Sequence, residues 1–479
     1  MKNGKRTLSI LLIMLLALIV LIITPFSQHL SKSYLALPLL PISFALTILL
    51  TPKFYYLSRN YLGIRIVYIV MFVRYTLMPL LIALSGEISL VNGVLPIDSY
   101  IIPSILTMIW ELIACVTAIV LVGNKLLKRK IDVDIDVTAN NNRINVIYGG
   151  VVILTLLLIA MHPDLLKNFQ FMKVTEATTI SISYYKGLDI RLLLLCKIAA
   201  YLMCIKKFSY LYSKNKQMIF YYLSLIASVI YISLYRGDNR TNIVVDIICV
   251  LVVLWYSFPK QRKKTVTLII STGIILFVSV SMYRMFGATS WRPEGATKEF
   301  SLSSIARLLQ LYISGPSNVA MSLMSSDNFR ATTHTLLNDI FIWTGYLGNA
   351  LNVNITDTTT YYFNATVYNH TWKGLSDQIV PMSGQGYFYL GYICAPIFSV
   401  ITCVWIVWLE KVFRQSKSID MLLITTFLLT RLSLFMGLNF TIMMMFFFDR
   451  YIQMWILVKL NSSVKLVKNK QTYKKLNHL

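Results

Sequence analysis

The sequence predicts an all-α polytopic membrane protein, and three observations predict it. Of the 479 residues, 56% are hydrophobic, and the mean hydropathy is +0.65. The apolar residues are gathered in unbroken blocks of roughly 20, the length that an α-helix needs to cross the hydrocarbon core of a bilayer. The basic residues recur in every second loop between these blocks, as expected for loops on the cytoplasmic side. We therefore expect one membrane-embedded domain over residues 1–479.

About twelve spanning helices are expected when each apolar block is taken as one crossing. The first block follows Lys2, Lys5 and Arg6 and resembles a signal peptide, but its apolar run is too long and lacks a small-residue cleavage site. We interpret it as a retained helix. The expected helices lie near 8–26, 34–52, 62–84, 101–123, 144–162, 190–210, 218–235, 241–258, 265–286, 386–409, 419–438 and 440–459.

The distribution of basic residues predicts the topology. The loop 85–100 contains no Lys or Arg, whereas the loop 124–143 contains five. This alternation continues along the chain and places both termini, including the basic tail 460–479, in the cytoplasm. The net charge of +25 follows from these loops, so nucleic acid is not expected as a partner, and anionic lipid is the expected neighbour of the basic clusters.

A few charged residues fall inside the predicted helices, where an ionised side chain is costly unless it is paired or functional. Arg74 and Glu111 lie near the middle of consecutive antiparallel helices, and we expect them to neutralise each other. Arg284 and Arg431 lie nearer the outer side. The sequence leaves open whether these two contribute to a positive pocket at the outer face or have a structural role.

The polar segment 287–385 interrupts the apolar blocks, and the charge pattern places it outside the cytoplasm. We expect it to be a large extracytoplasmic loop with two amphipathic helices at the membrane surface, separated by a break at 314–316. In the first helix, Arg307 is expected to face water or a lipid headgroup. Its expected apolar face consists of Leu302, Ile305, Leu309 and Tyr312, opposite Ser303, Ser304, Arg307 and Gln310. The second is indicated by Leu336, Leu337, Ile340, Phe341 and Leu347, with Trp343 and Tyr346 at interface depth.

Two arginines in a short outer loop could bind phosphate. Arg236 and Arg240 are four residues apart, with Gly237 between them, and guanidinium groups match the oxygen atoms of a phosphate. The alternative is that both anchor helix ends at the lipid headgroups.

Candidate general bases also lie in the segment 287–385. They are His334, His370 and Asp377, because an imidazole or a suitably placed carboxylate can accept a proton from a hydroxyl near neutral pH. Each of them could instead be an ordinary loop residue. The chain lacks a lysine-containing phosphate-binding loop, a dinucleotide fingerprint and a His-Glu-x-x-His motif. No cofactor and no metal are expected.

The chain resembles the Wzy-type polysaccharide polymerases, a family that polymerises O-antigen or capsule repeat units. The likeness covers about residues 190–440. Its motifs are the arginine-bearing turn 236–240, the break Tyr312-Ile313-Ser314-Gly315-Pro316 after Arg307, and Asp377-Gln378-Ile379-Val380-Pro381 followed by Gly384-Gln385-Gly386-Tyr387. Many members carry a glutamate near the position of Gln385, where this chain has an amide.

The resemblance implies a GT-C-like glycosyltransferase in the bacterial cytoplasmic membrane, with its active site on the outer side. The donor would be a growing glycan on undecaprenyl diphosphate, and the acceptor a lipid-linked repeat unit delivered by a flippase. A chain-length regulator and membrane lipid are the other implied partners. The product would be O-antigen, capsule or exopolysaccharide.

The roles that follow from the resemblance are electrostatic and acid–base. Charge that builds on the diphosphate leaving group would be stabilised by arginines, namely Arg236, Arg240, Arg307 and Arg284. The acceptor hydroxyl would lose its proton to His370 or Asp377, or else to His334. Sugar rings would stack on Tyr387, Tyr389 and Trp343. No metal is needed for this chemistry.

Two other functions stay open. A lipid-linked oligosaccharide flippase or exporter would also have about twelve helices, but it would be expected to have two similar halves and short loops. A glycan ligase would share the fold and the arginines, and the sequence does not separate it from a polymerase.

Overall fold

The computed structural model describes residues 2–27, 30–90, 94–127, 145–163, 165, 184–234, 240–286, 301–342, 344, 346–368 and 378–464. Within these residues every regular element is helical. The chain forms two compact units, and each is considered by itself below. Unit 1 comprises Met1–Ile131, Arg292–Arg414 and Leu428–Arg450, and unit 2 comprises Asp132–Trp291, Gln415–Phe427 and Tyr451–Leu479.

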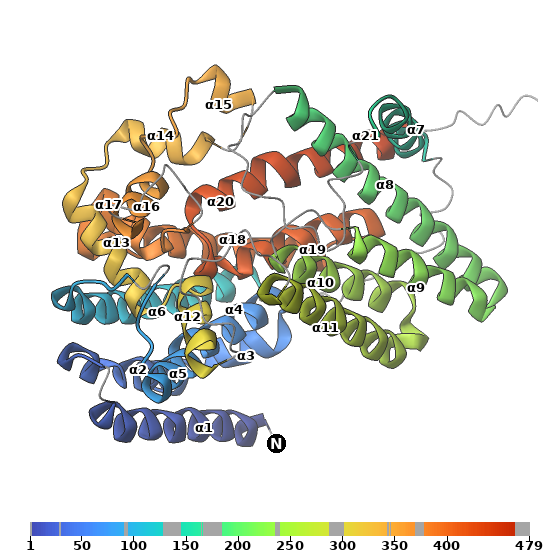
Figure 1. Cartoon of the computed structure of the whole chain (residues 1–479). Helices are drawn as coiled ribbons and strands as arrows, with labels where there is room; N and C mark the ends of the chain where they lie inside the picture. Colours follow the sequence, from blue (N-terminus) through green and yellow to red (C-terminus); the bar gives the residue numbers. More distant parts are fainter. Residues whose placement is uncertain are drawn as a thin grey trace, which may run out of the picture. The chain divides into compact units, whose positions relative to one another are not determined.

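Unit 1 contains most of the helices (Figure 1). The N-terminal set is α1 (Lys2–Ile23), α2 (Leu39–Leu50), α3 (Pro52–Asn60), α4 (Leu62–Phe72), a π-helical turn (Val73–Leu77), α5 (Met78–Ser85) and α6 (Ile101–Leu126). The later set is α12 (Leu302–Tyr312), α13 (Pro316–Asn328), α14 (Thr333–Phe341), α15 (Tyr346–Ala350), α16 (Thr359–Tyr368), α17 (Met382–Cys394), α18 (Ile397–Arg414) and α20 (Phe440–Met445).

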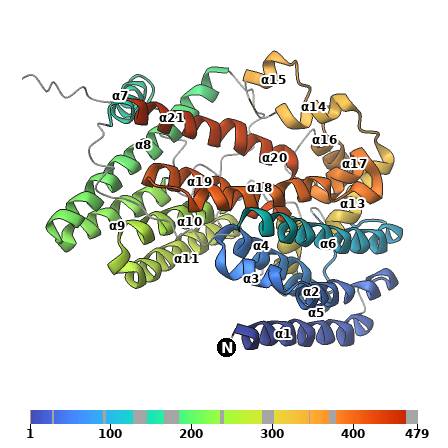
Figure 2. The same ribbon diagram turned by 180° about the vertical axis from the view of Figure 1, so that it is seen from behind.

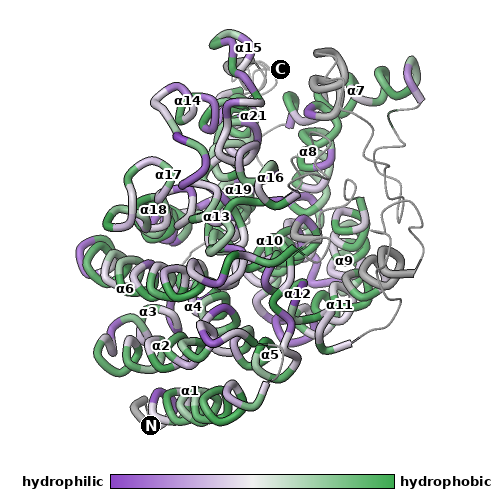
Figure 3. The backbone as a smooth tube through the Cα atoms, turned by 60° about the vertical axis from the view of Figure 1, so that its left-hand side comes forward, coloured by the Kyte–Doolittle hydropathy of each residue, from purple (hydrophilic) through white to green (hydrophobic). Residues whose placement is uncertain are grey.

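The N-terminal helices present an apolar surface. In Figures 1 and 2, α1 lies beside α2 and α5, and α6 lies beside α18. Leu8, Leu11 and Leu15 of α1 are 68%, 60% and 55% exposed. Figure 3 shows that α1, α2 and α6 are largely hydrophobic, whereas α14 and α15 carry hydrophilic stretches. Such an extended apolar face is suited to contact with lipid rather than water.

The predicted neutralisation of Arg74 by Glu111 is confirmed. Nη1 of Arg74 lies 2.8 Å from Oε2 of Glu111, and both side chains are 1% exposed. Nε of Arg74 also donates to the carbonyl oxygen of Ser314, 3.0 Å away, and Ser399 donates to the other oxygen of Glu111. Arg74 lies in the π-helical turn, a local irregularity that often marks a special packing requirement. The pair joins α6 and α18 to the turn between α12 and α13.

The break predicted at residues 314–316 is present. Helix α12 ends at Tyr312, and α13 begins at Pro316. Ser314 has a φ of 51°, a conformation that interrupts a helix. Pro316 occupies the first turn of α13, where its missing N–H is not required.

The helix predicted at 386–409 is broken in the structure. Helices α17 and α18 replace it and meet at an angle of 105°. Two residues explain the bend: Pro396 lacks a helical N–H and restricts the residue before it, and Gly391 has a φ of +69°. A Cβ atom on Gly386 would lie 2.1 Å from the carbonyl oxygen of Ala395, so only glycine permits this close approach of the two chain segments.

Unit 2 contains α7 (Val146–Met161), α8 (Tyr184–Asn215), α9 (Met218–Ser233), α10 (Arg240–Ser257), α11 (Arg262–Phe286) and α21 (Ile452–Ser463). The chain passes between the units within α19 (Ile419–Ser433). In unit 2, Lys197 pairs with Asp246 at 2.7 Å, and Lys206 pairs with Asp420 at 2.9 Å. These charges therefore neutralise each other inside the helical packing.

Each predicted crossing overlaps a helix or a helix pair, but fewer helices qualify as membrane spans. Within the described residues, five are long and apolar enough to cross a membrane, or up to seven if each of two bent pairs is one span. Helix α8 contains Arg191, Lys197, Lys206 and Lys207, and α7 and α9 have 16 residues each. The protein is thus an all-helical membrane protein, and the number of about twelve crossings stays a prediction.

Candidate functional site

The sequence-predicted site residues fall into three groups. His334, Arg307, Tyr387 and Tyr389 have described side chains, and all four belong to unit 1. The backbones of Arg240 and Arg284 lie in α10 and α11, and their side chains lie outside the described residues. The third group lies wholly outside the described residues, namely Arg236, Trp343, His370 and Asp377.

His334 lies in the first turn of α14. The hydroxyl of Thr332 accepts a hydrogen bond from the backbone N–H of Thr335, and the hydroxyl of Thr335 accepts one from the N–H of Thr332. This reciprocal arrangement is a capping box, which fixes where a helix begins. His334 is consequently held at a defined helix end and not on an irregular loop.

His334 forms a dyad with Asp357. Nδ1 of the imidazole lies 2.8 Å from Oδ2 of the carboxylate, and the histidine side chain is 63% exposed. The carboxylate also accepts hydrogen bonds from Thr335 at 2.7 Å, Tyr362 at 2.8 Å and Asn338 at 3.0 Å. An ionised Asp357 orients the ring with its proton on Nδ1, which leaves the lone pair of Nε2 available to accept a proton.

The environment of Asp357 keeps it ionised. Partial burial acts to raise its pKa, but the hydrogen bonds from His334, Thr335 and Tyr362 outweigh burial and lower the pKa below its ordinary value. Burial, together with the hydrogen bond to Asp357, raises the pKa of Tyr362 to about 12. Tyr362 therefore remains a hydrogen-bond donor to the carboxylate at neutral pH.

Asp339, five residues further along α14, is a fully buried carboxylate. It accepts hydrogen bonds from the hydroxyl and the backbone N–H of Thr359, from Gln385 at 2.7 Å and from Tyr389 at 2.7 Å. Within the part of the chain that the structure describes, no basic side chain pairs with Asp339. Burial raises its pKa, and the hydrogen bonds oppose this rise only in part.

Gln385 connects this carboxylate to a further helix. Its Nε2 donates to Thr441 at 3.0 Å as well as to Asp339, and its Oε1 accepts from the backbone N–H of Phe440 at 2.8 Å. Nearby, Asn439 donates to Thr360 at 3.1 Å. Helices α14, α16, α17 and α20 thus meet in one polar cluster, whose members are His334, Asn338, Asp339, Asp357, Thr359, Tyr362, Gln385, Tyr389 and Thr441.

Tyr389, one of the predicted sugar contacts, is hydrogen-bonded to the buried carboxylate. Its hydroxyl is held by Asp339, and its ring packs edge-on against Phe398 with the centroids 6.0 Å apart. Tyr387 instead lies beside Asp327, which also accepts a hydrogen bond from Tyr100 at 2.7 Å. The two tyrosines therefore do not form one stacking surface.

Arg307 is ion-paired. Its Nη2 lies 2.8 Å from Oε2 of Glu87, and Gln310 on the next turn of α12 donates to the carbonyl oxygen of Glu87. The side chain of Arg307 is 41% exposed, although its Nε is buried. Burial acts to raise the pKa of Glu87, but its hydrogen bonds with Arg307 and Ser89 lower it overall.

Helices α12 and α14 bury polar residues and expose apolar ones. In α12, Gln310 is fully buried, whereas Leu302 and Tyr312 are 42% and 48% exposed. In α14, Asn338 and Asp339 are buried, and Leu337 is 47% exposed. The predicted amphipathic pattern is thus present, and Gln310, Asn338 and Asp339 of its polar side are buried in the protein. Arg307 is directed to Glu87 rather than only to water.

One apolar cluster links the dyad to the ion pair. Leu90, three residues after Glu87, belongs to this cluster together with Phe363 of α16, and Leu311, four residues after Arg307, packs against it. Tyr362, which holds Asp357, packs against the same cluster and stacks on Phe329 with the ring centroids 4.9 Å apart. The dyad and the ion pair are therefore fixed to one packed core.

Asp339 and Asp357 were not predicted as site residues. Both lie in a segment that is poor in carboxylates, and this scarcity is the only sequence signal that could have drawn attention to them. Neither lies at a motif spacing relative to His334. Arg431, for which the sequence left two roles open, is 3% exposed, and its guanidinium lies 4.4 Å from the ring centroid of Phe446.

Comparison of the chain with models of protein families, with curated proteins and with solved structures finds no match.

Proposed function

We propose that this protein polymerises undecaprenyl-diphosphate-linked oligosaccharide repeat units into a surface polysaccharide, at the outer face of a bacterial cytoplasmic membrane. The observation that carries the proposal is the His334–Asp357 dyad, an exposed imidazole oriented by an ionised carboxylate. It lies in the polar segment predicted to be extracytoplasmic. The resemblance to Wzy-type polymerases and the helical membrane architecture support the same function, and a GT-C-like fold is part of the proposal.

The proposed reaction transfers the growing glycan to a new repeat unit. The hydroxyl of the acceptor repeat attacks the anomeric carbon of the donor glycan, and the bond from that carbon to the diphosphate oxygen breaks. Nε2 of His334 accepts the hydroxyl proton, and Asp357 stabilises the imidazolium that forms. Undecaprenyl diphosphate leaves with the electron pair.

Stabilisation of the leaving diphosphate is assigned to arginines. The exposed side of Arg307 can contact phosphate oxygens while Glu87 fixes its orientation. Arg236, Arg240 and Arg284 are the further arginines proposed for this role. His370 and Asp377 stay alternative bases, and Tyr387, Tyr389 and Trp343 stay proposed sugar contacts.

The buried cluster around Asp339 is assigned a positioning role. Gln385 stands near the position where many Wzy-type members carry glutamate, and here the carboxylate beside it comes from Asp339 instead. Because Asp339 follows Asn338 on α14, and Asn338 donates to Asp357, the cluster fixes the helix that carries His334.

Deletion of the gene in its host tests the proposal. A polymerase mutant would display surface glycan of single repeat units without long polymer. Accumulation of lipid-linked repeats on the inner leaflet, with no surface glycan, would instead indicate a flippase. Long polymer that stays on its lipid carrier and never reaches its final acceptor would indicate a ligase. Either of these two results would overturn the proposed polymerase function, and the flippase result would also overturn the assignment of His334.

A further inference from the structure

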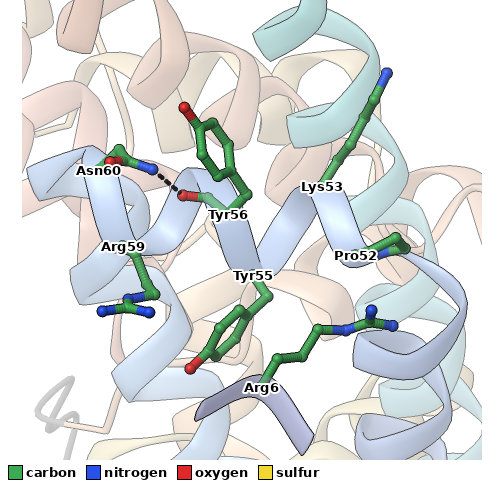
Figure 4. A pocket seen from close by; sticks show the side chains of 7 residues that line it. All are labelled: Arg6, Pro52, Lys53, Tyr55, Tyr56, Arg59 and Asn60. Carbon is green, nitrogen blue, oxygen red and sulfur yellow. Dashed lines mark hydrogen bonds between the residues drawn. The ribbon is translucent and has the colours of Figure 1, made fainter. Parts of the chain in front are cut away.

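A basic pocket of about 460 Å³ lies at one end of the N-terminal helices of unit 1. It is separate from the polar cluster described above, and it does not depend on the proposed polymerase function. Its lining residues come from α1 and α3 (Figure 4), namely Arg6, Pro52, Lys53, Tyr55, Tyr56, Arg59 and Asn60.

The pocket exists because the chain breaks between α2 and α3. Helix α2 ends at Leu50, and Pro52 starts α3 after Thr51. Nη2 of Arg6 donates to the carbonyl oxygens of Ile48 and Leu49, 3.3 and 2.5 Å away. These carbonyls would otherwise lack partners at the helix C-terminus, and their negative ends would repel an anion. By binding these carbonyl oxygens, Arg6 allows an anion to bind near this end of α2.

Tyr68 of α4 fixes the two walls of the pocket relative to each other. Its hydroxyl lies 2.8 Å from Oγ of Ser9 on α1. Its ring packs against the rings of Phe54 and Tyr55 on α3, with centroid distances of 5.9 and 6.0 Å. Arg6 on α1 and Tyr55 on α3 are thus held in place by one half-buried aromatic side chain, and the pocket is preformed.

The lining is cationic. Three of its residues carry positive charge, and none of the seven is acidic. Nε of Arg6 is buried and has no hydrogen-bond partner, which is unusual for a charged group. In Figure 4 the side chains of Arg6, Tyr55 and Arg59 extend to the same side of α3, whereas Lys53 points the other way. Two guanidinium groups flanking a tyrosine favour a phosphate-bearing ligand.

The surface next to the pocket is apolar. Leu8, two residues after Arg6, is 68% exposed, and Leu49 and Leu50, just before Pro52, are 51% and 76% exposed. A ligand seated on the arginines would therefore have an apolar surface beside it. This combination matches an anionic phospholipid, with its phosphate in the pocket and its acyl chains along α1 and the end of α2.

We propose that the pocket formed by Arg6, Tyr55 and Arg59 binds the phosphate headgroup of an anionic phospholipid. Because basic residues mark the cytoplasmic side, this lipid belongs to the inner leaflet. The site is distinct from the one proposed for the undecaprenyl-linked substrate, which lies in the segment predicted to be extracytoplasmic.

Lipid binding to the purified full-length protein in detergent tests this proposal. Native mass spectrometry with added phosphatidylglycerol or phosphatidylcholine gives the affinity for each. We expect phosphatidylglycerol to bind at least about tenfold more tightly, and the variant R6A/R59A to lose that preference. R59A alone should lose about three- to fivefold, and it tests the site even if replacing Arg6 disturbs the end of α2.

The matched control is K5A/K125A. It removes two exposed positive charges that do not line the pocket, and it should keep the preference for phosphatidylglycerol. An equal loss in this control would mean diffuse attraction to the basic surface and would overturn the proposed site. Inorganic phosphate and glycerol 3-phosphate are the probes for a soluble ligand. If either probe displaced phosphatidylglycerol at an equal concentration, the acyl chains would contribute nothing to the affinity, and the lipid assignment would fail.

Discussion

The amide of Gln385 on α17 donates a 2.7 Å hydrogen bond to the buried carboxylate of Asp339 on α14. These two residues are 46 positions apart in the sequence and lie on either side of α16, whose Thr359 binds the same carboxylate. The contact fixes the start of the bent α17–α18 pair against the helix that carries His334. The proposed chemistry therefore depends on a polar cluster whose buried carboxylate, Asp339, pairs with no basic side chain among the described residues.

Replacing His334 by alanine should lower the polymerisation rate by about 10²- to 10⁴-fold, the usual contribution of a general base. Asp357→Asn should cause a large loss as well, because an amide can hold the ring in the wrong tautomer. The double variant should be no worse than H334A alone, since the two residues act as a unit. The measurement is polymer length and yield in a deletion strain that carries each variant.

The control for H334A is His162→Ala, which removes an exposed histidine in unit 2. It should polymerise normally. Normal polymer from H334A at wild-type protein levels would exclude His334 as the base and favour His370 or Asp377.

Asp339→Leu should destabilise the protein strongly. The substitution removes the acceptor shared by Gln385, Tyr389 and Thr359, and each donor that finds no other partner costs about 1–3 kcal/mol. Asp339→Asn keeps one acceptor oxygen and should cost less. Thermal unfolding of the detergent-purified variants measures the difference. Equal melting temperatures for D339L and the wild type would contradict the buried network.

The stabilisation from Asp357 should disappear at low pH. Its pKa in the folded protein is below the unfolded value of about 3.9, so the hydrogen bonds stabilise the fold above that pH and are lost as the pH falls through the folded pKa. Wild type and D357N should thus differ by about 2 kcal/mol at pH 5–7. The gap should close below roughly pH 4. A gap that stays constant down to pH 3 would show that its source is not the ionised carboxylate.

Removing one member of the Arg74–Glu111 pair should lower the free energy of unfolding strongly, whereas replacing both by apolar residues should lower it little. Arg74→Ala leaves Glu111 as an uncompensated buried charge, and a loss of about 3–5 kcal/mol is expected. The double variant Arg74→Met with Glu111→Leu removes both charges and should recover most of this loss. Unfolding in detergent measures both. A double variant that is less stable than R74A would mean that the ion pair itself is needed, through its bonds to Ser314 and Ser399.

Variants of Glu87 and Arg307 distinguish a structural role of the ion pair from a role of Arg307 in binding the diphosphate. Glu87→Gln removes the charge of the partner and keeps a hydrogen-bond acceptor for Arg307, so polymerisation should continue. Arg307→Ala should abolish long polymer if the exposed side of the guanidinium contacts the diphosphate. The exposed Arg330→Ala is the matched control. Long polymer from R307A at normal yield would mean that Arg307 has only a structural role, through its ion pair with Glu87.

The sequence by itself determined the features that depend on local pattern. Long apolar blocks required helices, the break at 314–316 required a turn, and a charge of each sign in the middle of consecutive helices required a pair, as found for Arg74 and Glu111. It also indicated amphipathic helices at 302–312 and around 336–347. Each of these follows from spacing within one segment or from the cost of an isolated charge in an apolar medium.

Only the tertiary structure decided which side of each amphipathic helix faces the protein. Periodicity shows that two faces differ, but in a membrane protein the apolar face can turn outward, and so Gln310, Asn338 and Asp339 are buried. The bend between α17 and α18 and the partners of His334 were likewise beyond the sequence. Asp357 meets His334 because α14 and α16 pack together, and contacts between separate helices follow from packing and not from spacing along the chain.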